Sequence, residues 1–249
     1  MKSIPLLLAL AALAGTPVAA DAACDDPPAP RVNWIGCDKS KAELRGADLS
    51  GAILTRAQLT GADLRGARLS GADLNYADLR QAQLAGALLD KARALGANFN
   101  QADLSDALLT QTRMERAQLN GARLDRAQMH EALLYQAELH SASLLNVQLD
   151  ESNLRQVQLN GADLSGSSLR RANLSGANLE GARLHGVNLE KADLSRAQLF
   201  KADFSNANLV NANLGEATLF NTRFDGARLD GSLWIDRRRC RFDSIGECR

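Results

Sequence analysis

The sequence predicts an all-β solenoid, in which short extended segments joined by tight turns coil around an interior of leucine and alanine. A five-residue unit runs from Ala42 to Trp234 without an insertion or a deletion. Its large apolar position, here called the centre, is leucine at 32 of 39 units, and its small site, two residues earlier, is alanine at 31 of 39. Outside the first 22 residues, 16 of 18 glycines lie two positions after a centre, where a tight turn requires a positive φ. All five prolines precede Arg31, so none removes an N–H from the repeat.

A period of five fits neither an α-helix nor a plain strand, so the chain must turn a corner in every unit to point a side chain inward again. The centres that are not leucine are Ala94, Phe99, Met114, Met129, Phe204, Phe224 and Trp234. Ala94 leaves space in the interior. We expect Phe99 and Met114 to fill that space, rather than a ligand cavity to form there.

The first 22 residues have the features of a secretory signal peptide. Lys2 provides a positive charge, Leu6 to Leu13 is an apolar stretch too short to span a bilayer, and small residues precede cleavage sites after Ala20 or Ala22. No later segment is apolar enough to cross a membrane. A lipoprotein signal with Cys24 acylated is less favoured, because the residue three positions before this cysteine is an aspartate. The sequence therefore predicts a periplasmic or secreted protein.

Four cysteines suit an oxidising compartment, and they lie in two pairs at the ends of the exported chain. They are Cys24, Cys37, Cys240 and Cys248. Four cysteines allow three pairings, and the sequence pattern alone does not choose among them.

Units such as Ala62-Asp63-Leu64-Arg65-Gly66 resemble those of the pentapeptide-repeat proteins, whose unit is A(D/N)LXX. The resemblance covers about four-fifths of the chain. It implies a right-handed quadrilateral β-helix with four units per coil, so that residues twenty apart stack. With flanking units centred on Trp34 and Lys39, the repeat makes about ten coils and a rod on the order of 48 Å long.

On that architecture the two cysteine pairs lie at opposite ends of the rod, farther apart than the roughly 7 Å between Cα atoms that a disulfide allows. Cys24–Cys37 and Cys240–Cys248 are then the reasonable pairings. The expected organisation is a signal peptide over 1–22, an N-terminal cap over 23–41, the β-helix over 42–234 and a C-terminal cap over 235–249. We expect the caps to block the open β-edges.

Nothing in the sequence indicates an enzyme, a cofactor or a metal site. A narrow tube filled by leucine and alanine leaves no room for a substrate, and the repeat has no loops to build a cleft. His130 and His140 fall on opposite faces, with His185 several coils away. Glu43 stacks on Asp63, but arginines stack beside them, which favours a neutralised surface ladder over a catalytic carboxylate pair.

Polar residues just before the centres stack along one face and form the first binding candidate. They are Gln58, Asp78, Asn98, Gln118, Glu138, Gln158, Asn178 and Gln198. These side chains either hydrogen-bond along the rod or recognise a repetitive polymer such as a glycan.

Two further candidates lie near the C-terminal end. Phe200 and Phe220 stack at outward positions, with Val210 on another face, and indicate either a dimer or partner surface or packing under the C-terminal cap. The basic run consists of Arg237, Arg238, Arg239 and Arg241. It either meets anionic lipid or polysaccharide or forms a solvated, partly salt-bridged surface, and we favour the latter.

With 29 basic and 29 acidic residues, the chain carries no net charge and has no long-range attraction to nucleic acid or anionic membranes. We expect a non-enzymatic exported binding or scaffold protein whose partner is a protein or a polysaccharide, with a homodimer through the C-terminal end as one arrangement. Some pentapeptide-repeat proteins, including quinolone-resistance proteins, mimic DNA and bind DNA gyrase. Export and neutral charge disfavour that alternative here.

Overall fold

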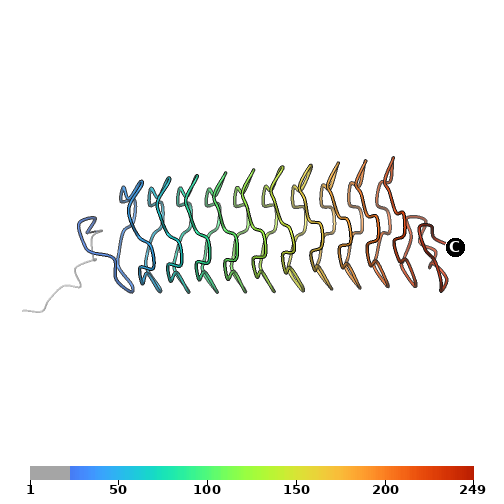
Figure 1. The fold of residues 1–249 in the computed structure, drawn as a ribbon, viewed down its shortest axis with the longest axis horizontal. Helices are drawn as coiled ribbons and strands as arrows, with labels where there is room; N and C mark the ends of the chain where they lie inside the picture. Colours follow the sequence, from blue (N-terminus) through green and yellow to red (C-terminus); the bar gives the residue numbers. More distant parts are fainter. Residues whose placement is uncertain (1–22) are drawn as a thin grey trace, which may run out of the picture.

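A computed structural model describes residues 23–249, which form a single right-handed quadrilateral β-helix, a straight rod of stacked coils (Figure 1). The predicted signal peptide lies outside the described residues. Between residues 23 and 249 there is no helix, and every β-element is a single bridging residue. The fold is therefore built entirely from corners and isolated bridges.

Parallel bridges join residues that are twenty apart, from Asn33↔Ile53 to Asn213↔Leu233. Each bridging residue stands directly before a centre, and four of them make one coil. We name the four faces of the rod by their first bridging residues: face A begins at Asp38, face B at Glu43, face C at Asp48 and face D at Asn33. The twenty-residue coil agrees with the architecture that the resemblance implied.

The corners are β-turns whose third residue has a positive φ. The Ala47 N–H donates to the Leu44 carbonyl at 3.0 Å, and Gly46 between them has φ 67°. The same left-handed conformation recurs at every fifth residue from Arg31 to Gly231, and most of these residues are not glycine; Tyr76, for example, has φ 58°. For a non-glycine residue this conformation costs roughly 1–2 kcal/mol, so the repeat imposes it against local preference.

The aspartate or asparagine before a centre has a structural role at the corner. Its Oδ1 accepts a hydrogen bond from the backbone N–H two residues later; the Ser165 N–H, for example, donates to Asp163 Oδ1 at 3.0 Å. In other coils the acceptor comes from the preceding coil: Asn100 Oδ1 accepts from the Asn120 N–H at 2.8 Å. A short polar side chain thus satisfies a turn N–H that the ladder between coils does not use.

The interior is a continuous column of centres and small sites that is closed to solvent. Ala94, Phe99 and Met114 are each fully buried, which agrees with the expected repacking around the missing leucine. Where a small site carries a hydroxyl, that group is paired; Ser167 Oγ donates to the Leu144 carbonyl at 2.6 Å. The hydroxyls at the small sites are therefore satisfied by backbone carbonyls.

At the N-terminal end, Cys24 is bonded to Cys37. Trp34 is fully buried over the first coil, and the Lys39 ammonium lies 4.1 Å from its ring centroid. Lys39 Nζ also donates to the Cys24 carbonyl at 2.6 Å. A lysine at a centre is thus accommodated because its charge lies on an aromatic face and meets a carbonyl at the end of the rod. Bridges already begin at Asn33, inside the segment expected to be cap.

At the C-terminal end, residues 235–249 leave the coil and turn back along it. Antiparallel bridges Leu233↔Arg239 and Arg228↔Ile245 place this segment across faces D and C, and a Cys240–Cys248 disulfide closes it. On face D, the Trp234 N–H donates to the Arg238 carbonyl at 2.8 Å. The C-terminal cap therefore pairs with the last coil on two of the four faces, C and D.

Candidate functional site

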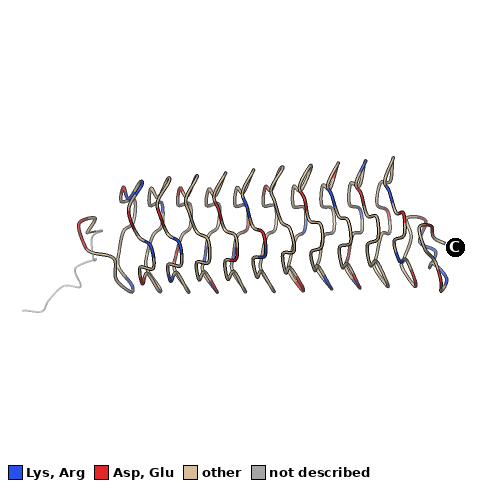
Figure 2. Ribbon diagram, viewed as in Figure 1, with Lys and Arg blue, Asp and Glu red and all other residues tan. Residues whose placement is uncertain are grey.

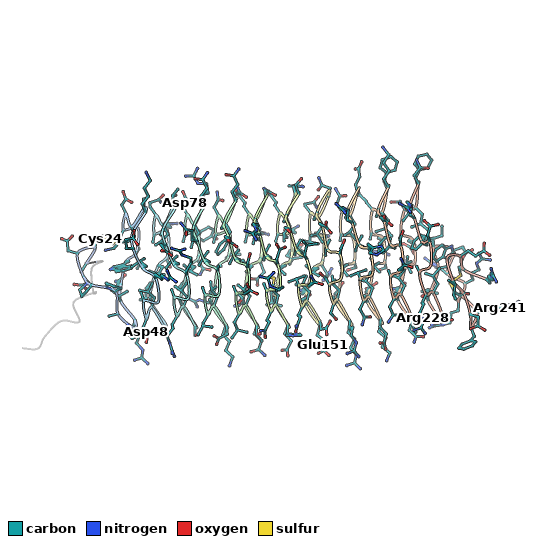
Figure 3. The ribbon with its side chains drawn as sticks, viewed as in Figure 1. Cys24, Asp48, Asp78, Glu151, Arg228 and Arg241 are labelled. Carbon is teal, nitrogen blue, oxygen red and sulfur yellow. A yellow bond between two sulfur atoms is a disulfide. The ribbon has the colours of Figure 1, made fainter. Side chains whose placement is uncertain are left out.

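Function in this molecule must lie on its outer surface, because side chains fill the interior (Figure 3). The best-formed hollows are shallow. One of about 390 Å³ is lined by Val210, Arg228 and Phe242 beside the C-terminal cap. Its lining is mainly apolar and amide groups, with one arginine and one aspartate that pair with each other.

The histidines do not form a metal site. His130 Nε2 lies 2.7 Å from Gln148 Oε1, and His140 Nδ1 lies 2.5 Å from Asn160 Oδ1. In the described part of the chain, no group of three His, Cys, Asp or Glu side chains is placed to hold a metal ion. His130 and His140 are thus hydrogen-bonded to polar neighbours on the surface.

Glu43 and Asp63 are bridge partners in neighbouring coils, but they do not behave as a catalytic pair. Arg65 binds the Asp63 carboxylate through two nitrogens, at 2.8 Å from Nε and 2.5 Å from Nη2. This hydrogen bond lowers the pKa of Asp63 to about 2. A carboxylate held in its charged form does not donate protons near neutral pH, which supports the neutralised ladder.

Charges of both signs alternate along the rod (Figure 2). Acidic and basic side chains pair two residues apart in the chain, as in Asp78–Arg80 at 2.6 Å, or one coil apart, as in Asp106–Arg126 at 2.6 Å. Each such exposed pair contributes little to stability. Their effect is to leave no extended face of a single sign.

The amide ladder on face A is less regular than the stacking suggests. Asn178 Nδ2 donates to Gln158 Oε1 at 3.3 Å, which is a bond along the rod. Gln118 Oε1 instead accepts from Asn100 Nδ2 at the adjacent corner, at 3.3 Å, and Gln198 is exposed. The prediction of amides bonded one above another therefore holds only in places, because longer side chains reach corner groups as easily as the next coil.

Phe200 and Phe220 form a stacked pair at the corner between faces A and B, with ring centroids 5.4 Å apart. Phe220 is 63% exposed, and Lys201 Nζ lies 4.6 Å from the centroid of Phe200. The cap does not cover this corner, so the expected alternative of packing under the cap is wrong. The pair lies beside Gln198 near the end of face A. The two rings and Lys201 therefore form an apolar, positively charged margin of that face.

Most of the basic run is engaged in contacts with the cap or with the neighbouring coils. Arg237 pairs with Glu216, Arg238 Nε lies 3.2 Å from Asp236 Oδ2, and Arg239 Nη1 donates to the Gly231 carbonyl at 3.0 Å. Arg241 is exposed at the end of the rod (Figure 3). The partly salt-bridged surface is thus the better interpretation.

The expectation that the caps block the open β-edges is wrong for half of the C-terminal end: within the described residues, the backbone edge at the end of faces A and B, next to Phe220, has no partner. Its signal in the sequence is the loss of the five-residue register after Trp234, since residues that leave the register do not continue the coil.

None of the described residues belongs to a helix that is long and apolar enough to span a membrane.

A family model for pentapeptide repeats matches eight copies in this chain, over residues 42–81, 67–106, 77–116, 97–134, 117–156, 158–196 and 197–233. Among solved structures, HetL, a pentapeptide repeat protein involved in heterocyst differentiation regulation from the cyanobacterium Nostoc sp. strain PCC 7120, is 34% identical. The match covers 84% of this chain and 92% of HetL, with a TM-score of 0.45. Full-length QnrB1, a plasmid-mediated fluoroquinolone resistance protein, is 17% identical over 80% of this chain and 91% of its own, with a TM-score of 0.33. No curated protein gave a match.

Proposed function

Because the chain belongs to the pentapeptide-repeat family, we propose that it is a non-enzymatic binding and scaffold protein that acts in the periplasm or as a secreted protein. The observation that carries this proposal is the uninterrupted ladder of twenty-residue coils from Asn33 to Leu233. A rod of this kind holds its surface side chains at fixed spacing. It suits extended contact with another molecule rather than the enclosure of a substrate.

Export is supported by the cysteines and by the N-terminal sequence. Both cysteine pairs are oxidised, which is typical of proteins outside the reducing cytoplasm. The signal-peptide features over residues 1–22 point to the same compartment.

The partner class that we favour is a protein or a polysaccharide. A DNA-mimicking regulator of gyrase would need a strongly acidic face, whereas arginines neutralise carboxylates along this rod, as in the Asp106–Arg126 pair. The chain as a whole has no net charge. A role at gyrase is therefore the weaker candidate.

A homodimer through the C-terminal end is the alternative to a different partner at the Phe200–Phe220 surface. Light scattering of the oxidised protein, with and without the double change Phe200→Ser and Phe220→Ser, tests it directly. A dimeric mass that falls to the monomer in the variant would establish this contact.

In-cell photo-cross-linking tests the proposed function. A benzophenone amino acid is placed at one exposed position on each face: Arg113, Arg123 and Gln128 on faces D, B and C, and Gln198 on face A. We expect the protein in the exported fraction, with its N-terminal segment removed, and a discrete cross-linked species from at least one position. A cytoplasmic protein that cross-links to gyrase and inhibits supercoiling would overturn the proposal, as would the absence of cross-links from every position.

A further inference from the structure

Each face of the rod holds the next coil through two backbone groups: the N–H of its centre and the carbonyl of its small site. On face A, the Leu199 N–H donates to the Thr218 carbonyl at 3.0 Å, and the Ala197 carbonyl accepts from the Thr218 N–H at 2.9 Å. The same pair of bonds recurs on all faces. In the last coil, these two groups must find another partner or remain open.

The cap provides that partner on faces C and D. On face C, the Leu229 N–H donates to the Ser244 carbonyl at 2.8 Å. The Ala227 carbonyl accepts from the Gly246 N–H at 2.9 Å. An extended peptide segment is therefore the kind of group that closes this end of the rod, and face D is closed in the same way.

On faces A and B the equivalent groups have no partner within residues 23–249. They are the N–H groups of Leu219 and Phe224 and the carbonyls of Ala217 and Thr222. Each of these faces thus offers one donor and one acceptor to an extended segment, the same two groups that the cap occupies on faces C and D.

The N-terminal edge of the rod is also unpaired on three faces, but it is protected by charge. Its bridging residues Asp38, Glu43 and Asp48 all carry carboxylates, which oppose the addition of a strand. At the C-terminal end, the equivalent residue of face A is the uncharged Thr218, followed by the half-buried Leu219. At this end an uncharged open edge lies next to the exposed ring of Phe220.

The surroundings indicate the chemistry of the missing strand. Leu219 presents the incompletely covered end of the core, and Phe220 presents an exposed ring one residue later. Lys201 lies beside the stacked rings and forms no ion pair with the described carboxylates. A strand laid here would place apolar side chains over Leu219 and Phe220 and a carboxylate near Lys201.

We propose that the edge from Ala217 to Phe220 binds an extended polypeptide segment of a partner protein by strand addition, with adjacent apolar side chains and an acidic residue as its recognition elements. The proposal rests on the proposed binding function and assigns a site and a partner class to it. A second copy of the chain fits less well, because joining two C-terminal ends brings their exposed Lys201 and Arg241 side chains together. A polysaccharide lacks the alternating amide donors and acceptors that this edge requires.

A displayed library of random linear dodecapeptides provides the probe. Peptides are selected on the oxidised wild-type protein, with an excess of the Thr218→Glu variant as soluble competitor. This change gives the edge a carboxylate like that of Glu43 at the protected end. We expect selected peptides to share neighbouring apolar residues with a nearby Asp or Glu, and to bind the variant at least tenfold more weakly.

Two further variants distinguish binding at the edge from binding elsewhere on the rod. Phe220→Ser should weaken binding several-fold while the backbone edge remains. Gln128→Glu, which adds a carboxylate at an exposed bridging position on a paired coil of face C, should leave the affinity unchanged. Melting curves show whether each variant is folded. If Thr218→Glu does not fold, the affinity of Phe220→Ser still tests the proposal.

Hydrogen exchange gives a residue-level readout. Bound peptide should slow exchange of the Leu219 amide, while the Leu199 amide, already bonded within the rod, should not change. Peptides that bind both edge variants like wild type, that protect another segment, or that are not obtained at all would overturn the proposal. A doubled mass without peptide would also overturn it, in favour of a second copy. If cross-linking in cells succeeds but peptide selection fails, the protein binds a partner and only the proposed site at Ala217 to Phe220 is wrong. If peptides bind this edge but no cross-link forms in cells, the proposed binding function is wrong.

Discussion

The rings of Phe200 and Phe220 stack outside the rod within 8° of parallel, with centroids 5.4 Å apart. Inside the rod, Phe204 and Phe224 repeat this arrangement at 5.3 Å and 9°. The two pairs differ in burial rather than in geometry. Comparing the same substitution in each pair therefore isolates the effect of burial.

Replacing Phe220 by alanine should lower the free energy of unfolding by about 1 kcal/mol, since an exposed ring loses mainly its stacking contact. Phe204→Ala should cost about 3–5 kcal/mol, because it opens a cavity in a closed interior. Denaturant unfolding of both variants measures the difference. Equal losses would mean that the interior around Phe204 is not tightly packed.

A second prediction concerns the irregular core layer at Ala94. Ala94→Leu alone should destabilise the protein by about 1–3 kcal/mol, because Phe99 and Met114 are expected to occupy the space already. The double change Ala94→Leu and Phe99→Leu restores the regular repeat and should recover most of that loss. A double-mutant cycle measures the coupling, and strictly additive effects would show that the two positions do not share this space.

The Cys240–Cys248 bond should stabilise the cap locally. Replacing both cysteines by serine removes the constraint on a separation of 8 residues, which corresponds to about 2–3 kcal/mol. Because repeats contact only their neighbours, the loss should stay at the end of the rod. Hydrogen exchange should accelerate at the Leu229 amide and remain unchanged at the Leu139 amide; acceleration throughout the rod would contradict this.

Stability should decline in acid over a defined range. A hydrogen bond from Arg65 lowers the pKa of Asp63 to about 2. Hydrogen bonds from Arg80 and Arg126 likewise lower the pKa values of Asp78 and Asp106, respectively. Groups with a lowered pKa stabilise the folded state above their unfolded pKa, near 4, and lose that contribution as the pH falls toward the folded value.

Denaturation midpoints should therefore be flat from about pH 6 to 4 and fall between about pH 4 and 2. Asp63→Asn should make that decline shallower. A decline already complete above pH 5 would implicate groups other than these carboxylates.

The five-residue period makes much of this molecule predictable. Leucine at the centre and alanine at the small site fix which side chains point inward, and the coil follows from the family that the units resemble. The period also places the turns, although glycine marks only some of them; Lys41 adopts φ 57° because its neighbours in the ladder require it.

The surface is less predictable, because the repeat fixes where an outward side chain starts but not which neighbour it reaches. Gln158 bonds along the rod to Asn178, whereas Gln118 bonds to a corner asparagine. The open edge at Leu219 depends on the path of residues 235–249, and these residues leave the period on which the prediction rests.

Since every face uses the same interior, an inserted five-residue unit would rotate everything beyond it by a quarter turn and leave the core intact. The outer columns would lose their partners: Asp106, for example, would no longer lie beneath Arg126. An inserted stretch of four units would instead keep the core and the alignment of the outer columns. In such a rod, the core tolerates the insertion of any number of five-residue units, whereas the outer columns stay aligned only when whole coils are inserted. Relatives can therefore diverge in what they bind without any change in how they fold.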